Sequence, residues 1–193
     1  TRSTQVFNAG ATGGTLTADR SVFAFRTDAN VNLGTFTLNI GDTATPANGA
    51  GIILNAGADI TGAAGSKINI GQSTLYLYAD DAAVSTLGVP ITNVRNNANN
   101  TLAPALVKFG SGTVDIGVPQ TLQGNIELNR GTFNLTAANV FPLFENLNVL
   151  TGGSMTLSPG TSIIFNNNNQ EFGGLASLNP SNSFQSSAGT VDL

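Results

Sequence analysis

Two adjacent carboxylates, Asp80 and Asp81, are the first residues of this sequence whose types and spacing suggest chemistry. Carboxylate oxygens are the ligands that Ca²⁺ prefers, so a calcium site is one interpretation of the pair. The other interpretation is a solvated turn that follows a strand. We favour the turn, because neighbouring residues of a strand face opposite sides and no third carboxylate lies nearby in sequence. A calcium-dependent lyase would also need a basic residue close to the pair, and Arg95 is weak support for one. We therefore expect no metal ligands.

Nucleophilic catalysis finds no support in the composition. Serines are plentiful, but the sequence contains no His and no Cys, which excludes a Ser-His-Asp triad, a cysteine nucleophile and a thiolate metal site. Carboxylates from different turns of the chain could pair for glycoside hydrolysis, although only eleven acidic residues are present in 193. We expect no catalytic residues, no cofactor-binding residues and no cofactor, and hence a protein that is not an enzyme.

Tyr76 and Tyr78 alternate with Leu75 and Leu77, so the two tyrosines share one face of a predicted strand. Two rings on one face could form a platform on which sugars stack. The simpler interpretation, which we favour, is that the leucines enter the core and the tyrosines cover an adjoining loop.

The composition predicts an all-β protein. Charged residues make up only 9 % of the chain, which has 23 glycines, two lysines and a single methionine. Long-side-chain helix formers are therefore scarce, whereas turn and strand residues are abundant. The net charge is −4, and the seven basic residues are scattered singly, which argues against nucleic acid as a partner. No apolar run approaches the ~18 residues of a membrane-spanning helix.

A short phrase, Gly-Thr-apolar-polar-apolar, recurs along the chain. Copies span 34–38, 112–116, 131–135 and 189–193, a shorter copy begins at Gly14, and a variant begins at Gly153. Neighbouring copies lie about 19 to 22 residues apart, within the range of repeat architectures. Each copy alternates with period two, which places Val114 and Ile116 on one face of a strand.

The phrase and the segments between its copies predict stacked coils. Further short alternating segments lie at 67–70, 74–78, 125–128 and 162–165. An antiparallel sandwich would also contain short alternating strands, but it needs no recurring phrase. A parallel β-helix does, because each position meets its equivalent one coil above. We therefore predict a single β-solenoid domain over 1–193 with nine or ten coils. Irregular loops are expected near 42–49, 95–101 and 141–145.

The segment 106–116, Leu-Val-Lys-Phe-Gly-Ser-Gly-Thr-Val-Asp-Ile, resembles the L-x-K-x-G-x-G-T-L-x-L pattern of the passenger-associated repeat of bacterial autotransporters. Segment 122–135 is similar to the continuation of that repeat. Segment 51–60 is similar to G-G-I-L-x-x-G-A-x-I, and segment 168–175 is similar to N-x-Q-x-x-G-x-L, patterns of the same family. The resemblance covers most of the chain between Thr15 and Leu193.

The resemblance implies a right-handed, single-stranded parallel β-helix displayed or secreted outside a Gram-negative cell. Its function would be structural or adhesive, its partners being further copies of itself, stacked end to end or laterally, and a host or matrix surface. No outer-membrane barrel is expected within the 193 residues. The final phrase, at 189–193, suggests a fragment, a processed passenger or a stacking subunit. Two other functions stay open: a pectate-lyase-like enzyme that acts on polysaccharides, and a self-assembling filament or sheath subunit.

Overall fold

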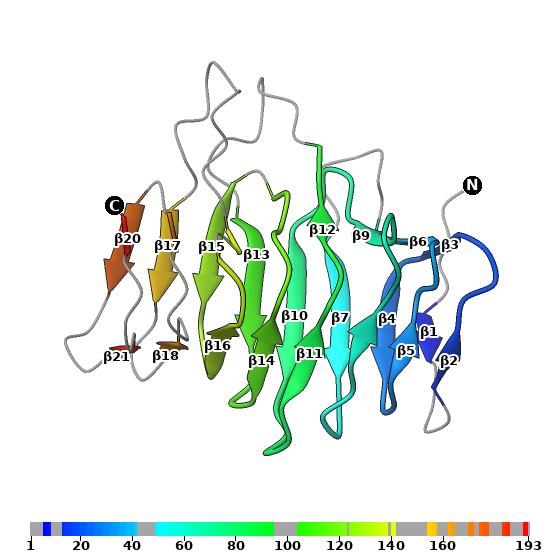
Figure 1. Cartoon of the computed structure of the whole chain (residues 1–193), viewed down its shortest axis with the longest axis horizontal. Coiled ribbons are helices and arrows are strands. Elements are labelled where there is room, and N and C mark those ends of the chain that lie inside the picture. Colours follow the sequence, from blue (N-terminus) through cyan, green and yellow to red (C-terminus); the bar gives the residue numbers. More distant parts are fainter. Residues whose placement is uncertain are drawn as a thin grey trace.

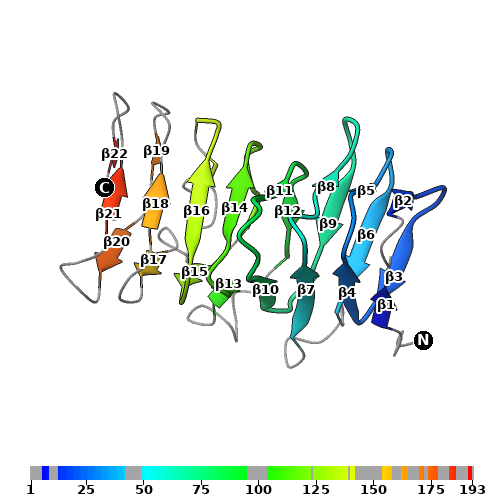
Figure 2. The ribbon, with the colours of Figure 1, turned by 90° about the horizontal axis from the view of Figure 1, so that it is seen from below.

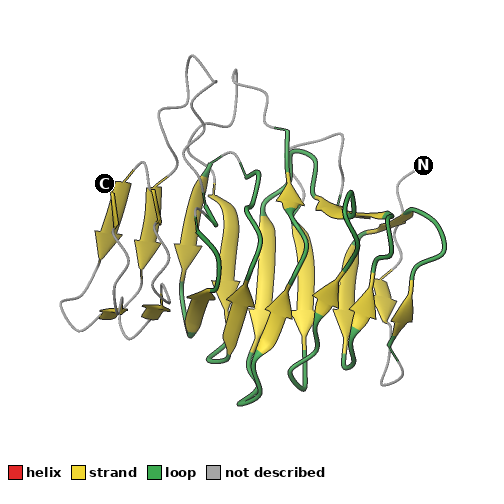
Figure 3. Cartoon of the chain, viewed as in Figure 1, coloured by secondary structure: helices red, strands yellow, loops and turns green. Residues whose placement is uncertain are grey.

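The structure of this protein is a computed structural model in which the described chain is built entirely from strands, turns and loops (Figures 1 and 3). The described residues are 6–8, 13–41, 49–94, 104–122, 124–138 and 140–141, together with the strand segments 154–157, 162–164, 170–171, 174–177, 183–185 and 191–192. None of these residues is helical, so this part of the chain offers no helix with the length and apolar character needed to cross a membrane.

Three parallel sheets, which we name A, B and C, contain most of the strands. Sheet A has eight strands, in pairing order β1 (Val6–Asn8), β4 (Ala24–Thr27), β7 (Ala50–Leu54), β10 (Leu75–Ala79), β13 (Pro104–Phe109), β15 (Asn125–Leu128), β17 (Ser154–Leu157) and β20 (Gly174–Ser177).

Sheet B also has eight strands: β2 (Gly14–Thr15), β5 (Val31–Asn32), β8 (Ile60–Thr61), β11 (Ser85–Leu87), β14 (Thr113–Ile116), β16 (Thr132–Leu135), β18 (Ser162–Ile164) and β21 (Ser183–Gln185). Sheet C has four: β12 (Ile91–Thr92), β9 (Lys67–Asn69), β6 (Thr37–Ile40) and β3 (Arg20–Val22). A separate pair joins β19 (Gln170–Glu171) and β22 (Val191–Asp192).

The chain visits the sheets in turn. Up to β13 it runs through a strand of sheet A, then sheet B, then sheet C, and returns to sheet A one strand further along, as the order of colours in Figure 2 shows. From β13 on, the described strands alternate between sheets A and B, with β19 following β18 and β22 following β21. Each strand therefore pairs with strands of the preceding and following turns, and every pairing is parallel; β10, for example, pairs with β7 and β13. This is the strand order of a parallel β-solenoid, as the sequence predicts.

The core consists of inward rows, in which equivalent positions of successive turns stack. In sheet A the row includes Phe25, Ile52, Leu77 and Leu128, and in sheet B it includes Val31, Ile60, Leu87, Ile116 and Leu135. All of these side chains are buried. Burying each one contributes about 1.5–3 kcal/mol relative to leaving it in water. The alternation read from Val114, Ile116, Phe133 and Leu135 is confirmed, because all four are fully buried.

The outer faces of sheets B and C carry polar side chains that bond from one turn to the next. On sheet C, the amide of Asn69 donates to the Asn39 side-chain oxygen at 2.9 Å. On sheet B, the amide of Asn134 donates to the Asp115 carboxylate at 2.7 Å. Near the start of β11, the Thr86 N–H donates to Asp59 Oδ1 at 2.7 Å. These two faces are therefore polar and are linked between turns by their side chains.

The recurring phrase does not mark one position of the coil. The copies at 112–116 and 131–135 stack directly as β14 and β16, but the copy at 153–157 contains β17 of sheet A and the copy at 34–38 leads into β6 of sheet C. The phrase instead describes a corner followed by a strand, a local unit that the coil uses on each of its sides.

The length of a turn also varies more than the phrase indicates. Leu77 pairs with Lys108, 31 residues later, whereas Lys108 pairs with Leu128, 20 residues later. Longer corners reduce the number of turns, and the described strands of sheets A and B give eight rather than nine or ten. The loops expected near 42–49, 95–101 and 141–145 lie almost entirely outside the described residues.

Stability is expected to depend on the inward rows. Replacing Leu87 by Ala leaves a cavity between Ile60 and Ile116, so the free energy of unfolding should fall by about 2–5 kcal/mol. The matched control is Thr86→Ala on the outer face of the same strand, where a change within about 0.5 kcal/mol is expected. Denaturant unfolding measures both, and equal losses would contradict the assignment of inner and outer faces.

Candidate functional site

A lysine lies in the core at the end of β13. Lys108 occupies the inward row of sheet A, in register with Leu77 of the preceding turn and Leu128 of the following one. Its side chain is fully buried. Burial of a lone ammonium is costly unless it is hydrogen bonded, so the surroundings of this group must provide acceptors.

Three backbone carbonyls accept hydrogen bonds from the Lys108 ammonium. The Nζ atom lies 3.0 Å from the oxygen of Gly110, 2.8 Å from that of Gly112 and 3.0 Å from that of Arg130. Gly110 and Gly112 form the corner after β13, and Arg130 belongs to the equivalent corner one turn later. An ammonium has three donors, and here each has a carbonyl acceptor. Lys108 thereby joins two successive corners.

Glycine is required where this cluster is tightest. A Cβ on Gly131 would lie 2.5 Å from the carbonyl oxygens of Gly110 and Gly112 and 2.6 Å from Lys108 Nζ. Both Gly110 and Gly131 have a φ of +82°, a conformation that side chains disfavour. The spacing Lys-x-Gly-x-Gly-Thr in 108–113 therefore has a local structural explanation: the glycines make room for the ammonium and expose carbonyls to it.

Desolvation lowers the pKa of Lys108 to about 8, although the negative charge of Asp80 opposes this effect. A lysine with a lowered pKa can serve as a base or nucleophile. Here the amine faces backbone carbonyls and is closed off from solvent. The arrangement therefore holds two corners together and leaves no space in which a substrate could reach the nitrogen.

Asp80 links the corner after β10 to the corner of the next turn. Its carboxylate accepts hydrogen bonds from the Ser111 hydroxyl and, at 2.7 Å, from the Ser111 N–H, while the Tyr78 hydroxyl donates to it at 3.0 Å. These bonds hold the pKa of Asp80 down, at about 2, with those from Ser111 contributing most. The same bond to Asp80 raises the pKa of Tyr78.

The neighbouring Asp81 accepts from the Ala83 N–H at 3.0 Å and so shapes its own turn. Asp80 and Asp81 therefore bond to different partners, and among the described residues no group of three or more His, Cys, Asp or Glu side chains could hold a metal ion. The favoured interpretation of this pair, an exposed turn, agrees with the structure, and the turn has the added role of bonding to the next coil. Arg95 lies outside the described residues.

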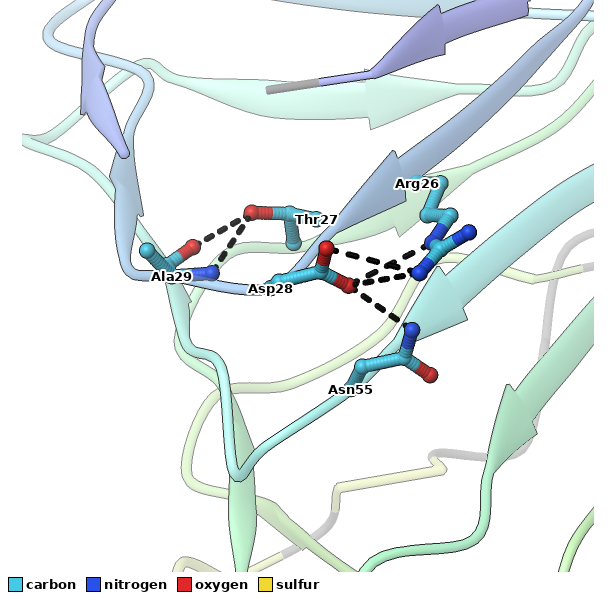
Figure 4. A network of polar contacts seen from close by, with 5 residues as sticks. All are labelled: Arg26, Thr27, Asp28, Ala29 and Asn55. Atoms are coloured by element: carbon cyan, nitrogen blue, oxygen red, sulfur yellow. Dashed lines mark hydrogen bonds and ion pairs between the residues drawn. The ribbon is translucent and has the colours of Figure 1, made fainter. Parts of the chain in front are cut away.

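A similar link joins two earlier corners (Figure 4). Asp28 accepts a hydrogen bond from the Asn55 amide of the next turn at 2.7 Å and forms an ion pair with Arg26 at 3.2 Å. Within the same corner, the Thr27 hydroxyl donates to the Ala29 carbonyl and accepts from its N–H. Side chains that cross from turn to turn are thus a general device along the edge between sheets A and B.

The outer face of sheet A differs from the polar faces of sheets B and C. Four exposed apolar side chains lie on its three adjacent strands β7, β10 and β13: Ile53 (38 % exposed), Tyr76 (45 %), Tyr78 (40 %) and Phe109 (38 %). The register places Tyr78 between Ile53 and Phe109. We call these four residues the sheet A patch.

The rings of the sheet A patch are held in place by their neighbours. Tyr76 stacks against Phe109 with ring centroids 6.2 Å apart and ring planes 24° from parallel. Tyr76 also lies over Gly49, where an added Cβ would come within 2.7 Å of the ring. The Tyr78 ring is fixed by its hydrogen bond to Asp80. Tyr76 therefore does cover the residue that precedes β7, as expected, yet both tyrosines stay substantially exposed.

The sequence alone does not identify Phe109 as part of the sheet A patch, nor Lys108 as a buried residue. Phe109 becomes part of the patch only through the register between β10 and β13, and this register cannot be read from the sequence. The burial of Lys108 had only a weak signal: Lys108 lies two residues after the buried Leu106, but burial does not alternate along β13, where Ala105 and Val107 are buried as well.

The Lys108 cluster predicts a large loss of stability on removal of the ammonium. Lys108→Met keeps most of the side-chain volume but removes the ammonium donor from three carbonyls, of which that of Gly112 also accepts from the Thr132 N–H. The free energy of unfolding should therefore fall by about 2–4 kcal/mol. Lys67→Met, at an exposed position of β9, is the control and should change stability by less than about 0.5 kcal/mol. A Lys108→Met protein as stable as the Lys67→Met protein would show that the carbonyls do not depend on the ammonium.

The pKa of Asp80 predicts a loss of stability in acid. Because the pKa of about 2 in the folded chain lies below the unfolded value of ~3.9, the carboxylate stabilises the fold above pH ~4, and this contribution disappears as the pH falls towards 2. The difference in melting temperature between the wild type and Asp80→Asn should therefore shrink over that range. Asp81→Asn, which removes the adjacent carboxylate and leaves the bonds of Asp80 in place, is the control. A wild-type advantage over Asp80→Asn that is the same at pH 5 and pH 2 would refute the assignment.

Comparison of the chain with family models, with curated proteins and with solved structures gives no match. The function is therefore argued from the geometry of the sheets, the corners and the sheet A patch.

Proposed function

We propose that this chain is a right-handed, single-stranded parallel β-helix that acts outside a Gram-negative cell as a structural and adhesive rod of the autotransporter passenger type. The observation that carries the adhesive part is the sheet A patch, an exposed apolar surface beside two polar sheet faces. The resemblance of segment 106–116 to the passenger-associated repeat supports the export route. Further copies of the chain and a host or matrix surface are the proposed partners.

The stacked turns suit a mechanical role. Each described strand of sheet A between β4 and β17 hydrogen bonds on both edges, and the corners add side-chain bonds such as Asn55 to Asp28 and Ser111 to Asp80. A rod built in this way resists bending because any local opening breaks several bonds in adjacent turns. Binding residues on its outer face would be displayed on a rigid support.

The non-catalytic part of the proposal is supported by the roles of the polar groups. Asp28, Asp59, Asp80 and Asp115 all accept hydrogen bonds from the next turn, so these carboxylates already have structural partners. Lys108 is enclosed by carbonyls. Among the residues that the structure describes, no observation favours a lyase over a binding protein.

Adhesion of coated beads tests the proposal. Beads that carry the wild-type chain should bind to epithelial cells or to extracellular matrix more than beads that carry an inert protein of similar charge. The double variant Tyr76→Thr/Phe109→Thr should lose most of this binding, because it removes two exposed rings and keeps good strand formers. Val84→Thr, at an exposed position outside sheet A, is the control.

Two results would contradict the proposal. One is the absence of adhesion by folded wild-type chain. The other is cleavage of polygalacturonate in the presence of Ca²⁺, which would favour the enzyme. Long filaments of purified chain in negative-stain images, without adhesion, would favour the sheath subunit.

A further inference from the structure

We propose that the sheet A patch binds neutral polysaccharide, with the tyrosine rings stacking against the apolar faces of pyranose rings. This inference rests on the proposed adhesive function and names the chemistry of the surface that the rod contacts. It is carried by four features of the patch: its size, its fixed rings, its hydrogen-bonding groups and its charge.

The size of the patch fits a short stretch of sugar chain. It extends over three neighbouring strands, which is about 10 Å at ~4.8 Å per strand, and over two alternate positions of β10, which is about 7 Å. A stable interface between two protein copies uses about 20–30 residues on each side. Four exposed apolar side chains are too few for such an interface, but they match the area of one or two pyranose rings.

The floor beside Tyr76 is flat. Ala24 and Gly51 lie in register with Tyr76 on the two preceding strands, so no large side chain rises there. Tyr76 leans over Gly49 and stacks on Phe109, and this contact orients its ring before any ligand arrives. Rings that are already ordered lose little conformational entropy on binding. An exposed, ordered ring next to a flat floor is suited to a planar sugar face.

Hydrogen-bonding groups lie at one edge of the patch. The Tyr78 oxygen donates to Asp80 and still has lone pairs that can accept from a sugar hydroxyl. Asp80 accepts three hydrogen bonds, from Tyr78 and from the N–H and hydroxyl of Ser111, so one of its roughly four acceptor positions is left for a ligand. A ligand rich in hydroxyl groups satisfies these acceptors, whereas an apolar ligand does not.

The charges around the patch favour an uncharged ligand. Asp80 has a pKa of about 2 and is therefore negative at neutral pH, and the chain carries a net charge of −4. Arg26, at the β4 side, is already paired with Asp28, and the positive charge of Arg130 acts on Tyr78 and Asp80 from the β15 side. Glu127 of β15 lies in the same register row as Tyr76 and Val107, and the exposed Asp81 follows Asp80. Carboxylates therefore outnumber Arg130 around the patch, and its net charge is negative. This negative charge disfavours acidic sugars and leaves neutral sugars unaffected.

Calorimetric titration tests this inference on the full chain. The probes are three neutral polysaccharides (laminarin, xyloglucan and galactomannan) and two acidic ones (polygalacturonate and alginate). We expect saturable binding of at least one neutral probe and weaker binding of both acidic ones. Tyr76→Thr should weaken that binding about tenfold, while Tyr76→Phe, which keeps the ring, should stay within about threefold of the wild type. Melting curves confirm that each variant is folded.

The adhesion experiment separates failure of this inference from failure of the proposed function. If the inference is correct, periodate oxidation of the target surface should abolish adhesion and protease treatment should spare most of it. Adhesion that resists periodate but is lost after protease would overturn the polysaccharide assignment and leave the adhesive function standing. If the wild-type chain does not adhere to untreated surfaces, both the adhesive function and the polysaccharide assignment are overturned. Titrations with no neutral binding, or self-association that Tyr76→Thr abolishes, would likewise overturn the inference.

Discussion

Parallel hydrogen bonding between successive turns is the interaction on which the rest of this structure depends. Each strand of sheets A, B and C pairs with its equivalents one turn away, so a residue stacks on residues 17 to 31 positions distant in sequence. The register gives the inward rows their continuity, since Ile52 must lie on Leu77 and Ile60 on Leu87. It also creates a requirement at the corners, where the backbone leaves the sheet and its polar groups need other partners.

The corners between sheets A and B meet this requirement with side chains that reach the next turn. Asp28 and Asp80 accept from the turn that follows, and Lys108 donates to carbonyls of its own corner and of the next one. Lys108 and Phe109 are adjacent on β13 and point to opposite faces. The same strand therefore carries the inward ammonium and the outward ring that stacks on Tyr76. In this way the buried cluster and the exposed patch are parts of one arrangement.

Much of the fold could be predicted from the sequence because alternation is a local property. The period of two in 74–78 and 125–128 identifies strands and faces without any knowledge of their partners. The number of turns could not be predicted, because corner lengths vary and the Gly-Thr phrase occurs on more than one side of the coil. The sheet A patch could not be predicted without the strand register, because only the pairing of β7, β10 and β13 brings Ile53, Tyr78 and Phe109 into one row. The adjacent carboxylates Asp80 and Asp81 could be recognised in the sequence. The hydrogen bond from Ser111 to Asp80 could not, because the two residues lie 31 positions apart.

The composition of the chain offers a direct optical measurement of whether binding takes place on the outer face of sheet A. The sequence has two tyrosines and no tryptophan, and both tyrosines belong to the sheet A patch. Intrinsic tyrosine fluorescence therefore reports on this patch without a label. We expect a saturable change in emission when a neutral polysaccharide is added, with the same midpoint as the calorimetric titration. Unchanged emission in a solution where calorimetry records binding would contradict it, because the ligand would then occupy another surface.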